Sequence, residues 1–98
     1  MDRAGFRARW KRFETKVAEA LGGKRIPITG RQEIDVAHSV FAIECKYRER
    51  LPEWLHKAHR QAQDGAREGQ IPIVALGEKG GRDYVVVALK DFASWYGK

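Results

Sequence analysis

The chain has 98 residues, of which 43 % are hydrophobic and 33 % charged, and a formal net charge of +6. This length supports one domain with one core, and the composition is typical of a folded globule. No apolar run reaches the roughly 20 residues of a membrane helix, and no apolar stretch of a secretory signal follows the basic N-terminus. A single cysteine excludes an internal disulfide or a multi-cysteine zinc site. We therefore expect one domain, 1–98, in the cytoplasm of a prokaryotic or phage-infected cell.

The positive charge is concentrated at the start of the chain. Residues 1–31 hold nine Lys or Arg against three acids, whereas residues 32–98 hold ten of each. A solvated helix face has this composition, and so does a nucleic-acid-binding surface, on which each neutralised phosphate releases counterions. Charge alone does not choose between them. The candidate phosphate contacts are Arg7, Lys11, Lys16, Arg25 and Arg31.

The first half of the chain predicts a helix followed by strands. Apolar residues recur at helical spacing from Phe6 to Leu21, with Asp2 available as N-cap and Gly22-Gly23 as the stop. Glu14 lies at the edge of this apolar stripe. A short extended segment, "KRIPI", then leads to a turn, and two strands are expected near 33–37 and 40–47.

The second half predicts a helix, two strands and a short final helix. Pro52 fits the first turn of a helix that runs to about Gly69, with an inward stripe of mostly small residues that includes Gln61. The apolar run "PIVAL", 72–76, predicts a strand covered on both faces, and "DYVVVAL", 83–89, predicts another. The last helix is expected near 91–96. This order indicates an α/β fold with a mixed sheet.

Charged residues interrupt the two strands expected at 33–37 and 40–47. Strand alternation puts Glu44 and Lys46 on one face of the second strand and its apolar residues on the other. A turn with an even number of residues brings Asp35 to the face of Glu44 and Lys46, and it also gathers the apolar residues on one buried face. We therefore expect these three ionisable groups to share one patch.

Two close carboxylates repel each other unless positive charge lies between them. A divalent cation such as Mg²⁺ suits this position, because it takes oxygen ligands and completes its shell with water and substrate phosphate. Lys46 could deprotonate or orient an attacking water, or stabilise negative charge in the transition state. Glu14 would be a third carboxylate if the first helix packs on this patch. Alternatively, Glu14 is a surface helix acid, and Glu44 with Lys46 is a solvated cross-strand pair.

This arrangement, Glu14, then Asp35, then Glu44-Cys45-Lys46, resembles the PD-(D/E)xK nuclease superfamily, and within it the small Holliday-junction resolvases of archaea and phages. The resemblance extends to a helix with Gln61-Ala62 and to the "PIVAL" strand. It departs from the family pattern in having Ile34, not proline, before Asp35. The fold that it implies is a restriction-endonuclease-like α-β-β-β-α-β core with a mixed central sheet flanked by helices.

The resemblance also implies an activity and its residues. The expected function is a magnesium-dependent endonuclease that resolves four-way DNA junctions as a homodimer, with Mn²⁺ able to substitute for Mg²⁺. Asp35, Glu44 and the carbonyl of Cys45 would hold the metal, with Glu14 as a further ligand. Lys46 would be the catalytic base or charge stabiliser. Gln61 would either act near the metal or bond a backbone group.

Two other functions are consistent with the sequence. A nuclease of the same superfamily could act on flaps, linear ends or damaged DNA, which keeps the chemistry and changes the substrate. A non-catalytic nucleic-acid-binding domain would keep the fold and the basic face. The C-terminal helix, with Trp95 and Tyr96, is the first candidate for a dimer interface.

Overall fold

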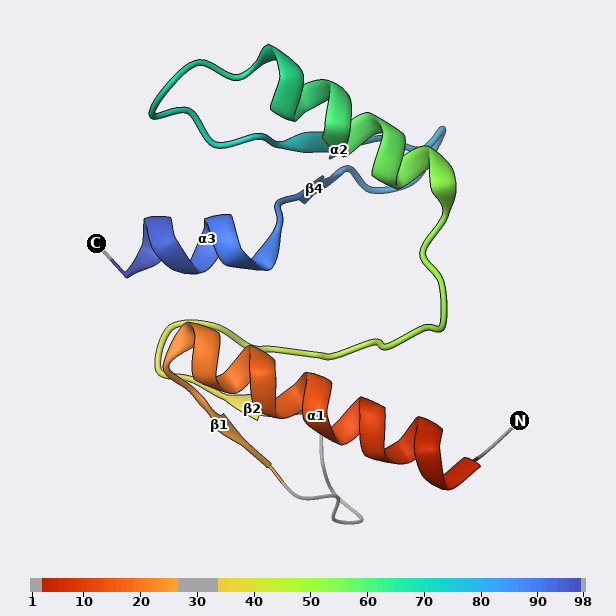
Figure 1. The fold of residues 1–98 in the computed structure, drawn as a ribbon, viewed down its shortest axis with the longest axis vertical. Helices are drawn as coiled ribbons and strands as arrows, with labels where there is room; N and C mark the ends of the chain where they lie inside the picture. The colour runs from red at the N-terminus through yellow and green to blue at the C-terminus, as the bar shows by residue number, and fades with distance from the viewer. Residues whose placement is uncertain (1–2, 27–33, 98) are drawn as a thin grey trace. The chain divides into compact units, whose positions relative to one another are not determined.

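Helices alternate with short antiparallel strand pairs along residues 3–26 and 34–97, the part of the chain that this computed structural model describes (Figure 1). The chain divides into two compact units: Met1–Arg48, with one helix and a strand pair, and Glu49–Tyr96, with two helices and a strand pair. The expected α/β class is therefore confirmed in its general form. The single domain over 1–98 stays a prediction.

The first unit is built on α1 (Arg3–Leu21), which packs against β1 (Lys24–Arg25) and β2 (Val36–Ala37). Of the apolar stripe that the sequence predicts, Val17 and Leu21 are buried, whereas Ala20 is exposed and Ala18 is buried instead. The helix ends at Leu21 because Gly22 adopts φ 75°, a left-handed conformation that favours glycine. The proposed N-cap, Asp2, lies outside the described residues.

The pairing of β1 with β2 requires a close backbone approach. The strands are antiparallel, with Lys24 opposite Ala37 and Arg25 opposite Val36. A Cβ atom at Gly23 would lie 2.6 Å from the carbonyl oxygen of Ala37, so only glycine fits at the start of this pair. Val36 is fully buried beneath α1 and forms the centre of the small core.

The segment 40–47 differs from its prediction. Among the described residues it pairs with β2 only through the bridge between Val36 and Ile43, so no second hairpin strand forms. The amides of Asp35 and Val36 both donate to the Ile43 carbonyl, at 2.9 and 3.3 Å. Two residues that oppose one are a β-bulge, which bends the strand and disrupts the ladder locally. Strict alternation in the sequence did not anticipate it.

The second unit contains α2 (Glu53–Gly65), β3 (Val74–Leu76), β4 (Tyr84–Val86) and α3 (Leu89–Tyr96). Strands β3 and β4 are antiparallel, with Ala75 opposite Val85, and α2 packs on β3. The helix α2 ends before the predicted Gly69, because Ala66 is extended and its amide turns back to the Gln63 carbonyl.

Two details of the second unit differ from expectation. Of the two residues proposed to start the inward stripe of α2, Leu55 is half-buried and Trp54 is exposed, and Gln61 lies on the exposed side. The "PIVAL" strand is covered on one face within this unit, since Val74 is buried and Ile73 is 52 % exposed. The described strands form two antiparallel pairs rather than one mixed sheet.

None of the helices in the described ranges is both long enough and apolar enough to cross a membrane.

Candidate functional site

Glu14 is the one buried charged residue among those described, with 5 % of its surface exposed. The sequence placed it at the edge of the apolar stripe, but α1 carries it into the interface with the strands. A buried carboxylate needs a partner, and Arg25 on β1 supplies one: its Nε donates to Glu14 Oε1 at 2.9 Å. Arg25 is therefore already engaged in an ion pair, although the sequence marked it only as a phosphate contact.

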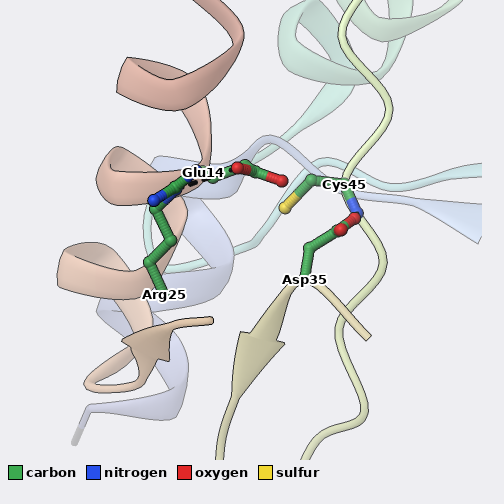
Figure 2. A network of polar contacts seen from close by, with 4 residues as sticks. All are labelled: Glu14, Arg25, Asp35 and Cys45. Atoms are coloured by element: carbon green, nitrogen blue, oxygen red, sulfur yellow. Dashed lines mark hydrogen bonds and ion pairs between the residues drawn. The ribbon is translucent and has the colours of Figure 1, made fainter. Parts of the chain in front are cut away.

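The bulge brings Asp35 against the segment that contains Glu44, Cys45 and Lys46. Asp35 Oδ2 accepts a hydrogen bond of 2.6 Å from the backbone amide of Cys45. Figure 2 shows this carboxylate at the Cys45 backbone and the Glu14 carboxylate directed toward the same residue from the other side. Two of the predicted acids thus approach Cys45 from different elements, α1 and the start of β2.

The thiol of Cys45 is affected by this acidic surrounding. Burial is the main cause that raises its pKa, from the ordinary 9.0 to about 11, and the negative charges of Asp35, Glu14 and Glu44 raise it further. All three predicted carboxylates are therefore near enough to Cys45 to act on it electrostatically. The sequence placed Cys45 correctly as a small buried residue, and its side chain is only 3 % exposed.

Glu44 and Lys46 project into solvent from the same segment. Their side chains are 51 % and 67 % exposed, and Lys46 Nζ lies 3.4 Å from Glu44 Oε1. An exposed pair of this kind contributes little to stability, about 0–1 kcal/mol, so neither residue is needed to hold the fold. Both groups remain accessible to a substrate.

The types of donor atom at this site match those that a hard divalent cation binds. Carboxylate oxygens and a backbone carbonyl are the ligands that Mg²⁺ prefers. The contacts with Arg25 and with the Cys45 amide each use one of the two oxygens of Glu14 and Asp35. Within the described residues, however, no three His, Cys, Asp or Glu side chains lie close enough together to hold an ion. Glu44 would have to turn inward to complete such a set.

The other predicted site residues are distributed over the chain. Arg7, Lys11 and Lys16 are exposed on α1, as phosphate contacts need to be, while Arg31 lies outside the described residues. Gln61 is exposed on α2, in the second unit, and its proposed role near a metal stays a prediction.

Sequence reasoning missed three residues beside α1. Tyr47 packs on Phe13 and, with Arg9 and Arg12, lines a hollow on the helix surface. The spacing of Arg9, Arg12 and Lys16 at i, i+3 and i+7 could have shown that these cations share one face. Nothing in the spacing could have shown that Tyr47 closes the hollow, because that contact joins distant parts of the sequence.

Comparison with known proteins found no matching family model, no matching curated protein and no matching solved structure.

Proposed function

We propose that this protein is a metal-dependent, structure-selective DNA endonuclease with a restriction-endonuclease-like core, and that it resolves four-way junctions. The observation that carries the proposal is the gathering of acids at Cys45. The buried Glu14 and the bulged Asp35 both act on this residue, and its chain neighbours are the accessible Glu44 and Lys46. Each acid has one structural partner (Arg25, the Cys45 amide or Lys46), but three carboxylates around one buried residue still repel one another, and a bound cation would relieve this repulsion.

The residues that would hold Mg²⁺ are Asp35, Glu44 and the carbonyl of Cys45, with Glu14 as a further ligand. When bound, the ion would supply Lewis-acid activation of a phosphodiester and neutralise its charge. The hydrogen bond from the Cys45 amide fixes one oxygen of Asp35, and the Arg25 guanidinium fixes one oxygen of Glu14. Both carboxylates are in this way oriented by contacts that the free protein already makes.

Lys46 has the position and exposure of a residue that acts on the substrate. Its side chain is 67 % exposed, and among the described residues its ammonium group makes only the weak pair with Glu44. It would orient an attacking water, take a proton from it, or stabilise negative charge on the phosphate. The exposed Arg7, Lys11 and Lys16 on α1 are freer to contact phosphate than Arg25, which is paired with Glu14. The products expected are 5′-phosphate and 3′-hydroxyl ends.

The proposed substrate is branched DNA, recognised by shape and by phosphate positions. The positive charge of the first 31 residues supplies sequence-independent affinity. A homodimer would present two equivalent sites to a two-fold junction.

Cleavage assays with a labelled four-way junction, a flap and a plain duplex test this proposal. In Mg²⁺ the wild-type protein should cut the junction, and chelator should stop the reaction. Lys46→Ala and Asp35→Ala should lose cleavage by about 100-fold or more, as expected for a lost general base or metal ligand, while junction binding is retained.

The matched controls are Lys79→Ala and Asp83→Ala, which remove the same charges from exposed positions between β3 and β4. Both should cut at the wild-type rate. If either Lys46→Ala or Asp35→Ala also cuts at that rate, the assigned roles are wrong. Preferred cleavage of the flap or duplex would leave the chemistry in place and change the substrate, as in the related nucleases that act on flaps or linear ends.

One observation favours a second candidate, a non-catalytic nucleic-acid-binding domain. Glu44 is turned to solvent, and the acids within the described residues do not form a three-ligand group. This candidate predicts salt-sensitive binding of DNA with no cleavage in Mg²⁺ or Mn²⁺. The same set of assays distinguishes it from the nuclease.

A further inference from the structure

The exposed side of α1 carries a hollow with cationic and aromatic walls. It has a volume of about 290 Å³ and is lined by Arg9, Arg12, Phe13, Lys16 and Tyr47. We call this feature the basic hollow. A neighbouring hollow of about 350 Å³ shares Arg12 and Lys16 with it, so these two side chains form the ridge between two concave surfaces.

The aromatic wall is held in place by packing. The ring of Tyr47 lies 5.5 Å from that of Phe13 and 5.9 Å from that of Phe6, measured between centroids, in tilted arrangements. Such pairs contribute about 0.5–1.5 kcal/mol beyond their buried area, which fixes the ring without covering it completely. Tyr47 is half-buried, so part of its ring stays accessible. The wall is therefore preorganised for contact with a flat ligand.

The three cations of the hollow form no ion pair with any residue that the structure describes. Ion pairs among the described residues join Glu14 to Arg25, Glu44 to Lys46 and Glu53 to Arg60, and none includes Arg9, Arg12 or Lys16. Like charges three and four residues apart destabilise a helix by about 0.2–0.5 kcal/mol per pair. A bound anion would remove this repulsion, so the charge arrangement itself points to an anionic ligand.

We propose that the basic hollow binds the sugar–phosphate backbone of a nucleic acid, with Arg9, Arg12 and Lys16 on phosphate and Tyr47 against an adjoining sugar or base. Cationic grooves with aromatic platforms suit nucleic acids, because every base offers a flat face. An anionic membrane suits the site less well. The exposed positions of α1 from Arg7 to Ala20 carry only Arg, Lys, Thr, Glu and Ala, so there is no bulky apolar side chain to insert into lipid.

The Arg12 and Lys16 side chains of the basic hollow lie on the other side of α1 from Glu14. With 3.6 residues per turn, Arg12 and Lys16 each lie about 160° around the helix from Glu14. Tyr47 directly follows Lys46 in the chain, so nucleic acid in the hollow would adjoin the cleaved position. The class of ligand, nucleic acid, rests on the proposed function. The position of its binding site rests on the charge and the shape of α1.

The test measures binding without cleavage, by fluorescence anisotropy of a short labelled duplex and a four-way junction in chelator. Arg12→Gln with Lys16→Gln should weaken binding about tenfold and should reduce the slope of log affinity against log salt by about 2. Arg82→Gln with Lys90→Gln removes the same charge from exposed positions of the second unit and should have a much smaller effect. Circular dichroism and thermal melting establish that both double variants are folded.

Conservative variants separate contact from general charge. Arg12→Lys with Lys16→Arg should restore the salt slope, and Tyr47→Phe should bind like wild type, since both keep the charge and the ring. Equal loss in the two Gln double variants would overturn the proposal, because it would make the effect one of net charge. The proposal would also be overturned if Arg12→Gln with Lys16→Gln bound DNA like wild type but lost binding to vesicles that contain phosphatidylserine.

The outcome is independent of cleavage. If the protein does not cut DNA in Mg²⁺ but the Arg12 and Lys16 variants lose binding as expected, the basic hollow stands and the nuclease proposal fails. If the protein cuts junctions and those variants bind with the affinity and salt slope of the control, the basic hollow is wrong and the nuclease proposal stands.

Discussion

Cys45 occupies the position where three acids and a small core meet. Its thiol is nearly inaccessible, and its backbone amide orients Asp35. A serine here would add a buried hydroxyl that needs a partner, and a larger residue would push against Glu14 or the bulge. A small apolar thiol satisfies both constraints, while the backbone amide of Cys45 makes the hydrogen bond to Asp35.

The raised pKa of Cys45 predicts low thiol reactivity in the folded protein. Because burial, Asp35, Glu14 and Glu44 raise its pKa from 9.0 to about 11, the thiol stays protonated at pH 8, and only the thiolate attacks an alkylating reagent. Iodoacetamide labelling, followed by mass spectrometry, should be slow at pH 8 and should accelerate toward pH 11. Denatured protein is the control and should react at the rate of a free cysteine.

The same shift makes stability depend on pH in a defined direction. The folded state favours the protonated thiol, so its contribution is complete below pH 9 and is lost as the pH rises through about 11. The free energy of unfolding of Cys45→Ala should therefore approach that of wild type above pH 9. Parallel pH profiles for the two proteins would contradict the shift.

For single residues, the sequence predicted which side chains are buried better than it predicted which side chains contact each other. The buried character of Cys45 followed from its alternation with Ile43. Turn parity predicted that the Asp35 side chain shares a face with Glu44 and Lys46, whereas Asp35 bonds the Cys45 amide beside the bulge and the other two side chains face solvent. The Glu14–Arg25 pair did not follow, because it joins residues eleven positions apart whose meeting depends on how α1 packs. The face of a helix or strand on which a side chain lies follows from the local sequence, whereas its contact partner depends on how the elements pack together.

At the scale of elements, the turn after β2 is held by one imidazole. His38 Nε2 lies 2.7 Å from the carbonyl oxygen of Leu21, and Nδ1 lies 3.0 and 3.3 Å from the amides of Val40 and Phe41. A carbonyl only accepts and an amide only donates, so the proton is on Nε2 and the Nδ1 lone pair accepts both amides. This ring ties the C-terminus of α1 to the turn that leads to the candidate site.

Replacing His38 should loosen that connection. His38→Ala removes partners from one carbonyl and two amides, and we expect a loss of about 2 kcal/mol in the free energy of unfolding. Urea denaturation of wild type and variant measures it. His56→Ala, at an exposed position of α2, is the control and should change stability by less than about 0.5 kcal/mol. A loss at His38 no larger than at His56 would show that the ring does not hold the turn.

The elements that the sequence predicted best are those with a long periodic signal. The stripe from Phe6 to Leu21 and the Gly22 stop gave α1 its correct end, and Pro52 marked the start of α2 within one residue. The segment 40–47 was mistaken for a full strand, because its alternation is genuine but the bulge at Asp35 ends the pairing. A bulge depends on two amides sharing one carbonyl, which leaves no mark in the pattern of apolar residues.

At the scale of the whole molecule, exposed aromatic surface bears on the proposed homodimer. Trp95 is 59 % exposed and, with Phe92, Ile71, Ile73 and Val87, lines an apolar hollow of about 330 Å³ in the second unit. Exposed apolar area of this kind is typical of a surface that another protein covers, and a second copy would match the symmetry of a junction.

The dimer prediction is tested by sedimentation velocity. Wild-type protein should sediment as a dimer, and Trp95→Glu should shift it to monomer, because a charge buried at an apolar contact is strongly unfavourable. Lys90→Glu, an exposed change on the same helix, is the control for charge and should remain dimeric. A monomeric wild type would refute the dimer, and a dimeric Trp95→Glu would place the interface elsewhere.

The bulge at Asp35 ends the strand pairing and, by doing so, lets the neighbouring segment reorient. By ending the ladder at Ile43, it leaves the strand-like segment of Glu44 and Lys46 without the regular pairing that would stiffen it. Reorienting Glu44 toward an incoming cation then requires no rupture of sheet hydrogen bonds. The proposed metal site requires this reorientation, because the Glu44 side chain faces solvent and pairs with Lys46.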